Sequence, residues 1–171
     1  MSQDDQEAVD RAKWEAIEEP VVLLHEEKFH EALAALHVVL LEDPKNYYAY
    51  HFLGVALYEV KELEGARDAF RACTALAPQH LGASIALANV LRETGDPQGA
   101  LKEALRAHGL KNEDGDALHA VGMAYVALGD RVSARRYLNA FMDKKPEFEV
   151  GVEVQALLDA FDQEAAANRT N

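Results

Sequence analysis

The sequence has few residues that cross-link or interrupt a chain: its 171 residues include one cysteine and five prolines. The lone Cys73 cannot form a disulfide within the chain, which favours a reducing compartment and a role for Cys73 as a small buried hydrophobe. No apolar run approaches the roughly 20 residues that a membrane-spanning helix needs. The N-terminal MSQDDQEAVDR is acidic, whereas a secretory signal begins basic and continues apolar. We therefore expect a cytoplasmic protein without membrane insertion.

Basic side chains are scarce at the two ends of the chain. Residues 1–46 carry 4 basic and 12 acidic side chains, a net −8, and residues 149–171 carry 1 basic and 5 acidic, a net −4. The middle, 47–148, has 12 basic and 13 acidic side chains and is nearly neutral. Nucleic acids and anionic membranes require a basic face, so neither is an expected partner. The acidic ends fit solvated caps on a stack of repeats, with attraction of a basic partner as the alternative.

The sequence also lacks the short motifs that bind phosphates or activate a nucleophile. It has no Gly-x-Gly-x-x-Gly stretch, no phosphate loop ending in Gly-Lys-Ser/Thr and no serine in a nucleophile elbow. His25 and His30 lie five residues apart across an expected helix break, whereas a zinc-binding helix needs two histidines four apart. His30 and His37 share a helix face without an evident third ligand. We predict no catalytic residue, metal site or cofactor, and hence no enzyme.

The chain instead repeats itself every 34 residues, in the segments 13–46, 47–80, 81–114 and 115–148. The segments align without a gap, and four of their positions carry the pattern. The rows are Pro20, Gly54, Ala88 and Gly122 at position eight, Ala32, Ala66, Ala100 and Ala134 at twenty, Leu36, Phe70, Ala104 and Leu138 at twenty-four, and Pro44, Pro78, Asn112 and Pro146 at thirty-two. Apolar residues spaced by three and four within each segment predict two amphipathic helices.

This pattern resembles the tetratricopeptide repeat, which has a bulky residue, Leu-Gly, Tyr, Ala, Phe and Pro at fixed offsets in 34 residues. The segment 47–80 fits best, with Tyr50, Leu53, Gly54, Leu57, Ala66, Phe70 and Pro78. In the first segment Glu19 and Pro20 replace the Leu-Gly pair. The resemblance implies an all-α fold, a right-handed superhelical solenoid of tetratricopeptide-type helix pairs with a C-terminal capping helix. We expect about nine helices and no strands.

Local signals place the helix ends. Asp96-Pro97 and Asp130 suit helix starts, and Gly95 and Gly129 suit the left-handed residue that often ends a helix. Helix pairs should therefore break near 60–63, 95–97 and 129–131. Glycine or alanine at position eight should let two helices approach closely, with the alanine of position twenty as the facing small residue.

The predicted organisation adds two flanking elements to the repeats. It comprises an acidic N-terminal helix extension at 1–12, a degenerate repeat at 13–46, three further repeats at 47–80, 81–114 and 115–148, a capping helix at 149–166 and a frayed tail at 167–171. A helix over 6–18 should be kinked by Pro20 or restarted with Pro20 in a first turn. The capping helix should bury Val150, Val154, Leu157, Leu158 and Phe161.

The resemblance also implies a binding surface, because in this family the first helix of each repeat lines a concave groove. Matched position by position, the groove residues are Tyr48, His51, Val55, Tyr58, Ile85, Asn89, Arg92, His119 and Met123, with Asp116 beside His119. The first repeat would offer Trp14, Ile17, Val21, Leu24 and His25, of which Trp14 and Ile17 have packing as the stronger alternative. The lysine, asparagine and arginine set that grips a C-terminal carboxylate in one subclass is missing.

We therefore predict an adaptor that binds a peptide or helix of a partner protein in this groove. One alternative is a small chaperone of the kind that binds type III secretion translocators, which shares the size and layout. Another is a self-associating scaffold, a homo-oligomer whose groove is filled by its own chain or a second copy.

Overall fold

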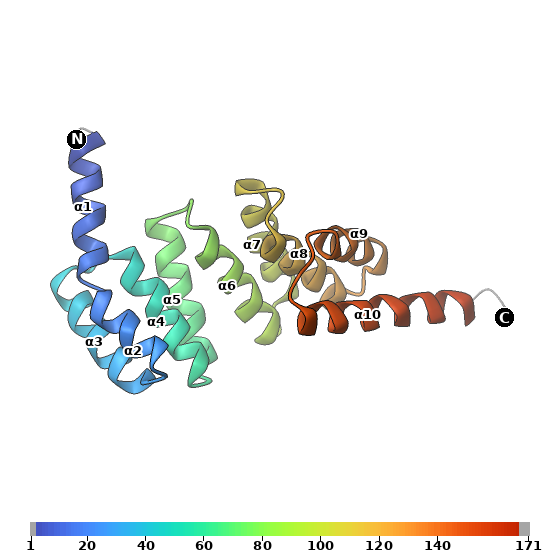
Figure 1. Ribbon diagram of the computed structural model, residues 1–171, viewed down its shortest axis with the longest axis horizontal. Coiled ribbons are helices and arrows are strands. Elements are labelled where there is room, and N and C mark those ends of the chain that lie inside the picture. The colour runs from blue at the N-terminus through green and yellow to red at the C-terminus, as the bar shows by residue number, and fades with distance from the viewer. Residues whose placement is uncertain (1–2, 168–171) are drawn as a thin grey trace. The chain divides into compact units, whose positions relative to one another are not determined.

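The computed structural model describes residues 3–167, which form ten α-helices and no strand (Figure 1). In chain order the helices are α1 Gln3–Glu15, α2 Glu18–His25, α3 Phe29–Glu42, α4 Tyr47–Glu59, α5 Leu63–Leu76, α6 Leu81–Glu93, α7 Pro97–Leu110, α8 Gly115–Leu128, α9 Arg131–Met142 and α10 Phe148–Ala167. The predicted all-α class is confirmed, with one helix more than expected. Of the predicted frayed tail, residues 168–171 lie outside the described residues, and Ala167 ends α10.

The chain divides into two compact units, residues 1–90 and 91–171. In the first unit α2 packs on α3 and α4 on α5, and in the second α7 packs on α8 and α8 on α9. Three residues join α4 to α5 and two join α8 to α9, so each pair is antiparallel. The helix breaks at 60–62, 94–96 and 129–130 agree with the predicted ones.

The turn inside each helix pair uses a left-handed residue at the fifteenth position of the repeat. Gly95 and Gly129 have φ of +83° and +76°, as their identity predicts. In the two earlier repeats the same position holds Glu27 at +59° and Lys61 at +66°, where a side chain opposes this conformation. Neither residue prefers positive φ, so the left-handed geometry of these two turns had no local signal, although their positions were predicted.

Side-chain caps start most of the paired helices. Asp96 and Asp130 cap α7 and α9 as predicted, accepting from the backbone N–H groups of Gly99 (2.8 Å) and Ser133 (3.1 Å). The first helices have a cap row of their own at position thirty-four, which was not predicted. There the N–H groups of Ala49, Ala83 and Ala117 donate to Oδ1 of Asn46, Nδ1 of His80 and Oδ1 of Asp114, at 3.1, 3.0 and 3.1 Å.

Pro20 divides the N-terminal helix earlier than predicted. The helix expected over 6–18 ends at Glu15, and α2 restarts at Glu18 with Pro20 buried in its first turn. A continuous helix would bring the proline ring against the carbonyl of Ala16 and leave that carbonyl without its usual N–H partner. The restart is thus confirmed, and the break falls before Pro20 by about one turn. The resulting α2 has 8 residues, against 13 in α4.

The glycine of position eight faces a different residue from the one predicted. A Cβ placed on Gly54 would lie 2.6 Å from Cε1 of Phe70, and one on Gly122 would lie 2.6 Å from Cδ2 of Leu138. The side chain across the helix crossing is therefore that of position twenty-four, whereas the alanine of position twenty was expected there. The glycine makes room for a large side chain, so the two rows form one packing unit.

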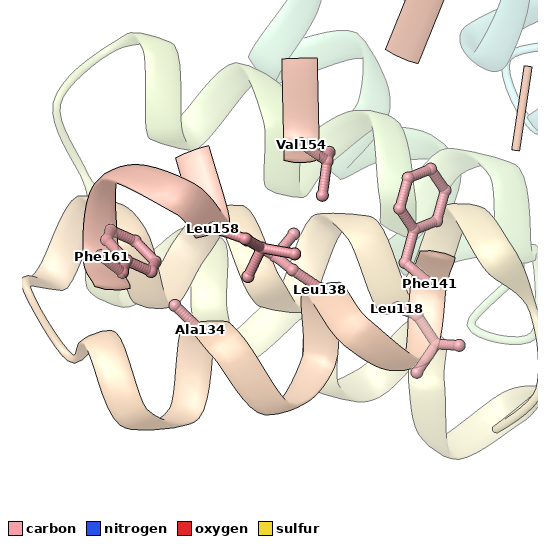
Figure 2. Packing of buried hydrophobic residues seen from close by; sticks show 7 residues of the cluster. All are labelled: Leu118, Ala134, Leu138, Phe141, Val154, Leu158 and Phe161. Carbon is pink, nitrogen blue, oxygen red and sulfur yellow. The ribbon is translucent and has the colours of Figure 1, made fainter. Parts of the chain in front are cut away.

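The C-terminal helix completes the core of the second unit. One cluster gathers buried side chains of α8, α9 and α10: Leu118, Ala134, Leu138, Phe141, Val154, Leu158 and Phe161. Figure 2 shows Leu138 and Leu158 side by side at its centre. Val154, Leu158 and Phe161 are buried as predicted, while Val150 and Leu157 are half-buried against the same cluster. Helix α10 thus covers the apolar face of the last helix pair.

Candidate partner-binding surface

The nine residues predicted for the groove lie on α4, α6 and α8, and each of them is half-buried. In the first unit, Tyr48, His51, Val55 and Tyr58 follow one another by three or four residues and form one stripe along α4. Ile85 and Asn89 lie on α6. Four of the nine predicted residues therefore lie on one face of a single helix, α4.

Aromatic rings support the N-terminal end of this stripe. The ring of Tyr48 lies 5.3 Å from that of Trp14, edge to face, and 4.2 Å from that of Tyr47. The ring of His80 lies 4.7 Å from His51 and 6.3 Å from Tyr48, so it joins both members of the stripe. We call Trp14, Tyr47, Tyr48, His51, Phe52 and His80 the aromatic cluster. Such ring pairs fix side-chain positions before a partner arrives.

Three members of the aromatic cluster were not predicted. Tyr47 and Phe52 fall outside the family's groove positions, and His80 precedes α6. The one available signal for His80 was its place in the row of Asn46 and Asp114, since all three cap a first helix. Because Nδ1 of His80 accepts the bond from Ala83, its proton lies on Nε2.

Burial keeps the aromatic cluster uncharged at neutral pH. Burial lowers the pKa of His51 to about 4, with a smaller contribution from the neighbouring His80. Burial also lowers the pKa of His80. The pKa of Tyr47 is raised by burial and by hydrogen bonding to Tyr48 and Asp10. Nδ1 of His51 is buried without a hydrogen-bond partner among the described residues, in keeping with a ring that is costly to charge.

The first repeat contributes less to this surface than the resemblance implies. Ile17 is fully buried and Leu24 is buried, and both pack in the cores that α3 and α4 complete, so neither lines a groove. Trp14 lies on α1, is 43% exposed, and packs edge-on against Tyr48 and Phe52. The early end of α1 places Ile17 in a turn that faces the core, a position that helical spacing alone did not give.

In the second unit, His119 anchors the predicted surface on α8. Its ring lies 4.9 Å from that of Phe141. Burial and the charge of Arg92 lower the pKa of His119, while Asp116 and Glu153 oppose the shift. Met123 packs against the cluster of α8, α9 and α10. Within this unit the structure therefore brings His119 together with Phe141 and carboxylates.

Residues 3–167 hold neither a metal-binding cluster nor a membrane-spanning helix. No three histidine, cysteine, aspartate or glutamate residues there are arranged to hold a metal ion. The same residues contain no helix both long and apolar enough to cross a membrane.

The family of the second repeat follows from a comparison with known proteins. The tetratricopeptide repeat model matches residues 47–80. These residues are a tetratricopeptide repeat. The match begins at the first residue of α4 and extends past the end of α5, so this repeat carries the stripe of Tyr48, His51, Val55 and Tyr58. No curated protein sequence matches the chain.

Solved structures share the fold of the chain. A crystal structure of MamA protein aligns with a TM-score of 0.70 and 22% identity, over 81% of this chain and 76% of that one. A second crystal structure of MamA gives 0.69 and 20%, over 85% and 95%. MamA from Desulfovibrio magneticus RS-1, from residue 41 to its end, gives 0.70 and 18%, over 77% and 74%. At these identities the likeness concerns the fold, and it agrees with tetratricopeptide-type helix pairs.

Proposed function

We propose that the protein is an adaptor that holds a segment of a partner protein against the first helices of its tetratricopeptide repeats. The observation that carries this proposal is the half-buried stripe of Tyr48, His51, Val55 and Tyr58 on α4, within residues that match the repeat family. The fold supports the coarser statement, a scaffold for protein–protein interaction. The stripe and the aromatic cluster support the more specific proposal that a partner segment binds along the first helices.

The chemistry of the stripe suits an apolar, hydrogen-bonding segment. Tyrosine presents a rigid ring with a polar tip, and such residues carry much of the binding energy in protein interfaces. Because ring contacts on several sides already fix Tyr48, little side-chain entropy remains to be lost on binding. His51 is neutral at pH 7 and adds a half-buried ring to the stripe. A helix or extended peptide with apolar anchors fits these properties.

Self-association is a second candidate, favoured by a different surface. On α3, Val38 and Leu41 are exposed, and Leu41 is 82% exposed although it is a large apolar side chain. Residues three apart on a helix share one face, so the pair forms an apolar spot on α3. A second copy of the chain that covered this spot would bury it. The two candidates involve different helices and can be separated by mutation.

The test begins with affinity purification from the native cell and mass spectrometry to identify the partner. Calorimetric titration then compares the wild type with Tyr58→Ala, and with Leu41→Ala as a control that also removes an apolar side chain. We expect Tyr58→Ala to weaken the partner at least several-fold, since a tyrosine anchor can contribute about 2 kcal/mol. Leu41→Ala should bind as the wild type does. If instead Leu41→Ala weakened binding and lowered the mass in light scattering, while Tyr58→Ala bound normally, the self-associating scaffold would be favoured over the adaptor.

A further inference from the structure

A pocket in the second unit joins the predicted groove positions of α8 to the start of α10. It has a volume of about 580 Å³, within the range of roughly 300–1,000 Å³ that is typical of small-ligand sites. Its lining residues are Gly115, Asp116, His119, Phe141, Lys144, Pro146, Glu147 and Val150. Asp116 and His119 are the second and fifth positions of the fourth repeat, where the resemblance places ligand contacts. We infer that this pocket takes a lysine or arginine side chain from the bound segment.

The floor of the pocket suits the aliphatic stem of such a side chain. Phe141 is buried and lies 4.9 Å, ring to ring, from His119. Pro146 and Val150 add apolar surface, and both are half-buried. Long basic side chains pack their methylene groups on surfaces of this kind while the charged end reaches a polar rim.

The rim supplies the matching charge. Asp116 and Glu147 are exposed, line the pocket and form no ion pair among the described residues. The one cation in the lining, Lys144, is already paired, with Nζ 3.1 Å from Oε2 of Glu113. Glu153 lies near enough to raise the pKa of His119, which adds a further carboxylate on this side of α10. A guanidinium or ammonium group would complete the pairing that the two rim carboxylates lack.

Two features favour an anion in this pocket instead, but the balance of full charges around the pocket outweighs them. The pocket lies at the N-terminal ends of α8 and α10, where the helix dipole favours anions, and Arg92 acts on His119. A dipole end is equivalent to about half a charge, whereas Asp116 in the first turn of α8 and Glu147 just before α10 each bring a full carboxylate to the rim. Burial keeps His119 neutral at pH 7, so carboxylates outnumber cations around the pocket. The pocket therefore selects a cation.

The assignment rests on the proposed function, because the basic residue belongs to the segment that the repeats hold. Its test uses the full chain and three blocked pentapeptides, acetyl-Ala-Ala-Xaa-Ala-Ala-amide, with arginine, citrulline or glutamate at the centre. Citrulline has the shape of arginine without its charge. Binding is followed by the amide shifts of the protein in two-dimensional NMR.

We expect the arginine peptide to bind at least fivefold more tightly than the other two and to shift residues 115–119 and 146–150. The double change Asp116→Asn and Glu147→Gln should weaken the arginine peptide at least fivefold. Asp159→Asn, which removes a charge from another face of α10, should have no effect. Equal binding of citrulline or glutamate, no binding by any peptide, or an unaffected double variant would each overturn the assignment.

The identified partner then separates this assignment from the proposed function. If the partner requires Tyr58 but tolerates the double change at Asp116 and Glu147, the adaptor function stands and the basic pocket is wrong. If neither change weakens the partner, both proposals are wrong. If light scattering shows a dimer that the double change dissociates, the pocket holds a second copy of this chain, which would overturn the assignment to a partner segment.

Discussion

Asn46 joins α1 to α4: its Nδ2 donates to the carbonyl oxygen of Lys13 (2.9 Å), while its Oδ1 accepts from the N–H of Ala49 (3.1 Å). The carbonyl of Lys13 is available because α1 ends at Glu15, and the N–H of Ile17 donates to the carbonyl oxygen of Trp14 instead. The break imposed by Pro20 thus creates an unpaired acceptor, and the buried side chain of Asn46 satisfies it.

Asn46→Ala should consequently destabilise the first unit more than the loss of a cap alone. Loss of the cap costs about 1 kcal/mol, and loss of the part-buried bond to the Lys13 carbonyl costs about 1 kcal/mol more. Urea unfolding followed by circular dichroism measures the change. Asp114→Ala, which removes a cap from α8, provides the matched control at about 1 kcal/mol. Equal losses in the two variants would show that the bond to Lys13 contributes nothing.

The close approach of Gly54 to Phe70 predicts that even a methyl group is too large at this crossing. Gly54→Ala places Cβ 2.6–2.8 Å from three atoms of the Phe70 ring, and such overpacking costs about 1–3 kcal/mol. Gly109→Ala on α7, where a Cβ meets nothing within 4 Å, should instead stabilise by up to about 1 kcal/mol. Thermal melting of both variants tests the contrast. A double variant with Phe70→Leu should recover part of the loss, and full additivity would argue against the contact.

The left-handed turns at Glu27 and Lys61 offer a stabilising change. Glu27→Gly removes a conformational cost of about 1–2 kcal/mol, offset by about 0.5–1 kcal/mol of greater chain entropy in the unfolded state. We expect a net gain of roughly 0.5–1 kcal/mol in chemical unfolding. Lys61→Gly should gain less, because the ammonium of Lys61 lies 5.2 Å from the centre of the Tyr58 ring and this attraction is lost. A destabilised Glu27→Gly protein would contradict the left-handed conformation.

Stability should fall between pH 7 and pH 5 because His51 is buried in its neutral form. Its pKa is about 4 in the folded state against 6.5 when unfolded, so the unfolded state binds more protons in this window. The contribution of neutral His51 to the free energy of unfolding is fully present above pH 6.5. It is lost as the pH falls, by about 2 kcal/mol at pH 5 for His51 alone. The lowered pKa values of His80 and His119 act in the same direction.

His51→Gln should flatten this pH dependence, measured as the urea midpoint at pH 7 and pH 5. The carboxyl groups of Asp43 and Asp130, whose pKa values are lowered, contribute stability that is lost only near and below their ordinary pKa of 3.8. These two carboxyl groups therefore do not change the stability between pH 5 and pH 7, where the histidines act. An unchanged slope in His51→Gln would mean that the buried charge of His51 does not govern stability here.

Features encoded by one residue and its neighbours were predictable. The breaks at Gly95 and Gly129 and the caps at Asp96 and Asp130 follow from local backbone preferences, and all four are confirmed. The turns at Glu27 and Lys61 were located by the repeat, while their left-handed geometry had no local signal. Membership of the nine groove residues in a single partner site stays a prediction, although each of them is half-buried.

The sequence by itself determined the 34-residue register and the two-helix composition of the repeats, because helical spacing, caps and chain breaks act over a few residues. Only the tertiary structure decided which side chains meet across the helices. It placed Ile17 in the core, set Phe70 against Gly54, and brought the ring of His80 to 4.7 Å from that of His51. Those contacts depend on how whole helices pack, since side-chain volumes must fill the space between them, and no local pattern records that fit.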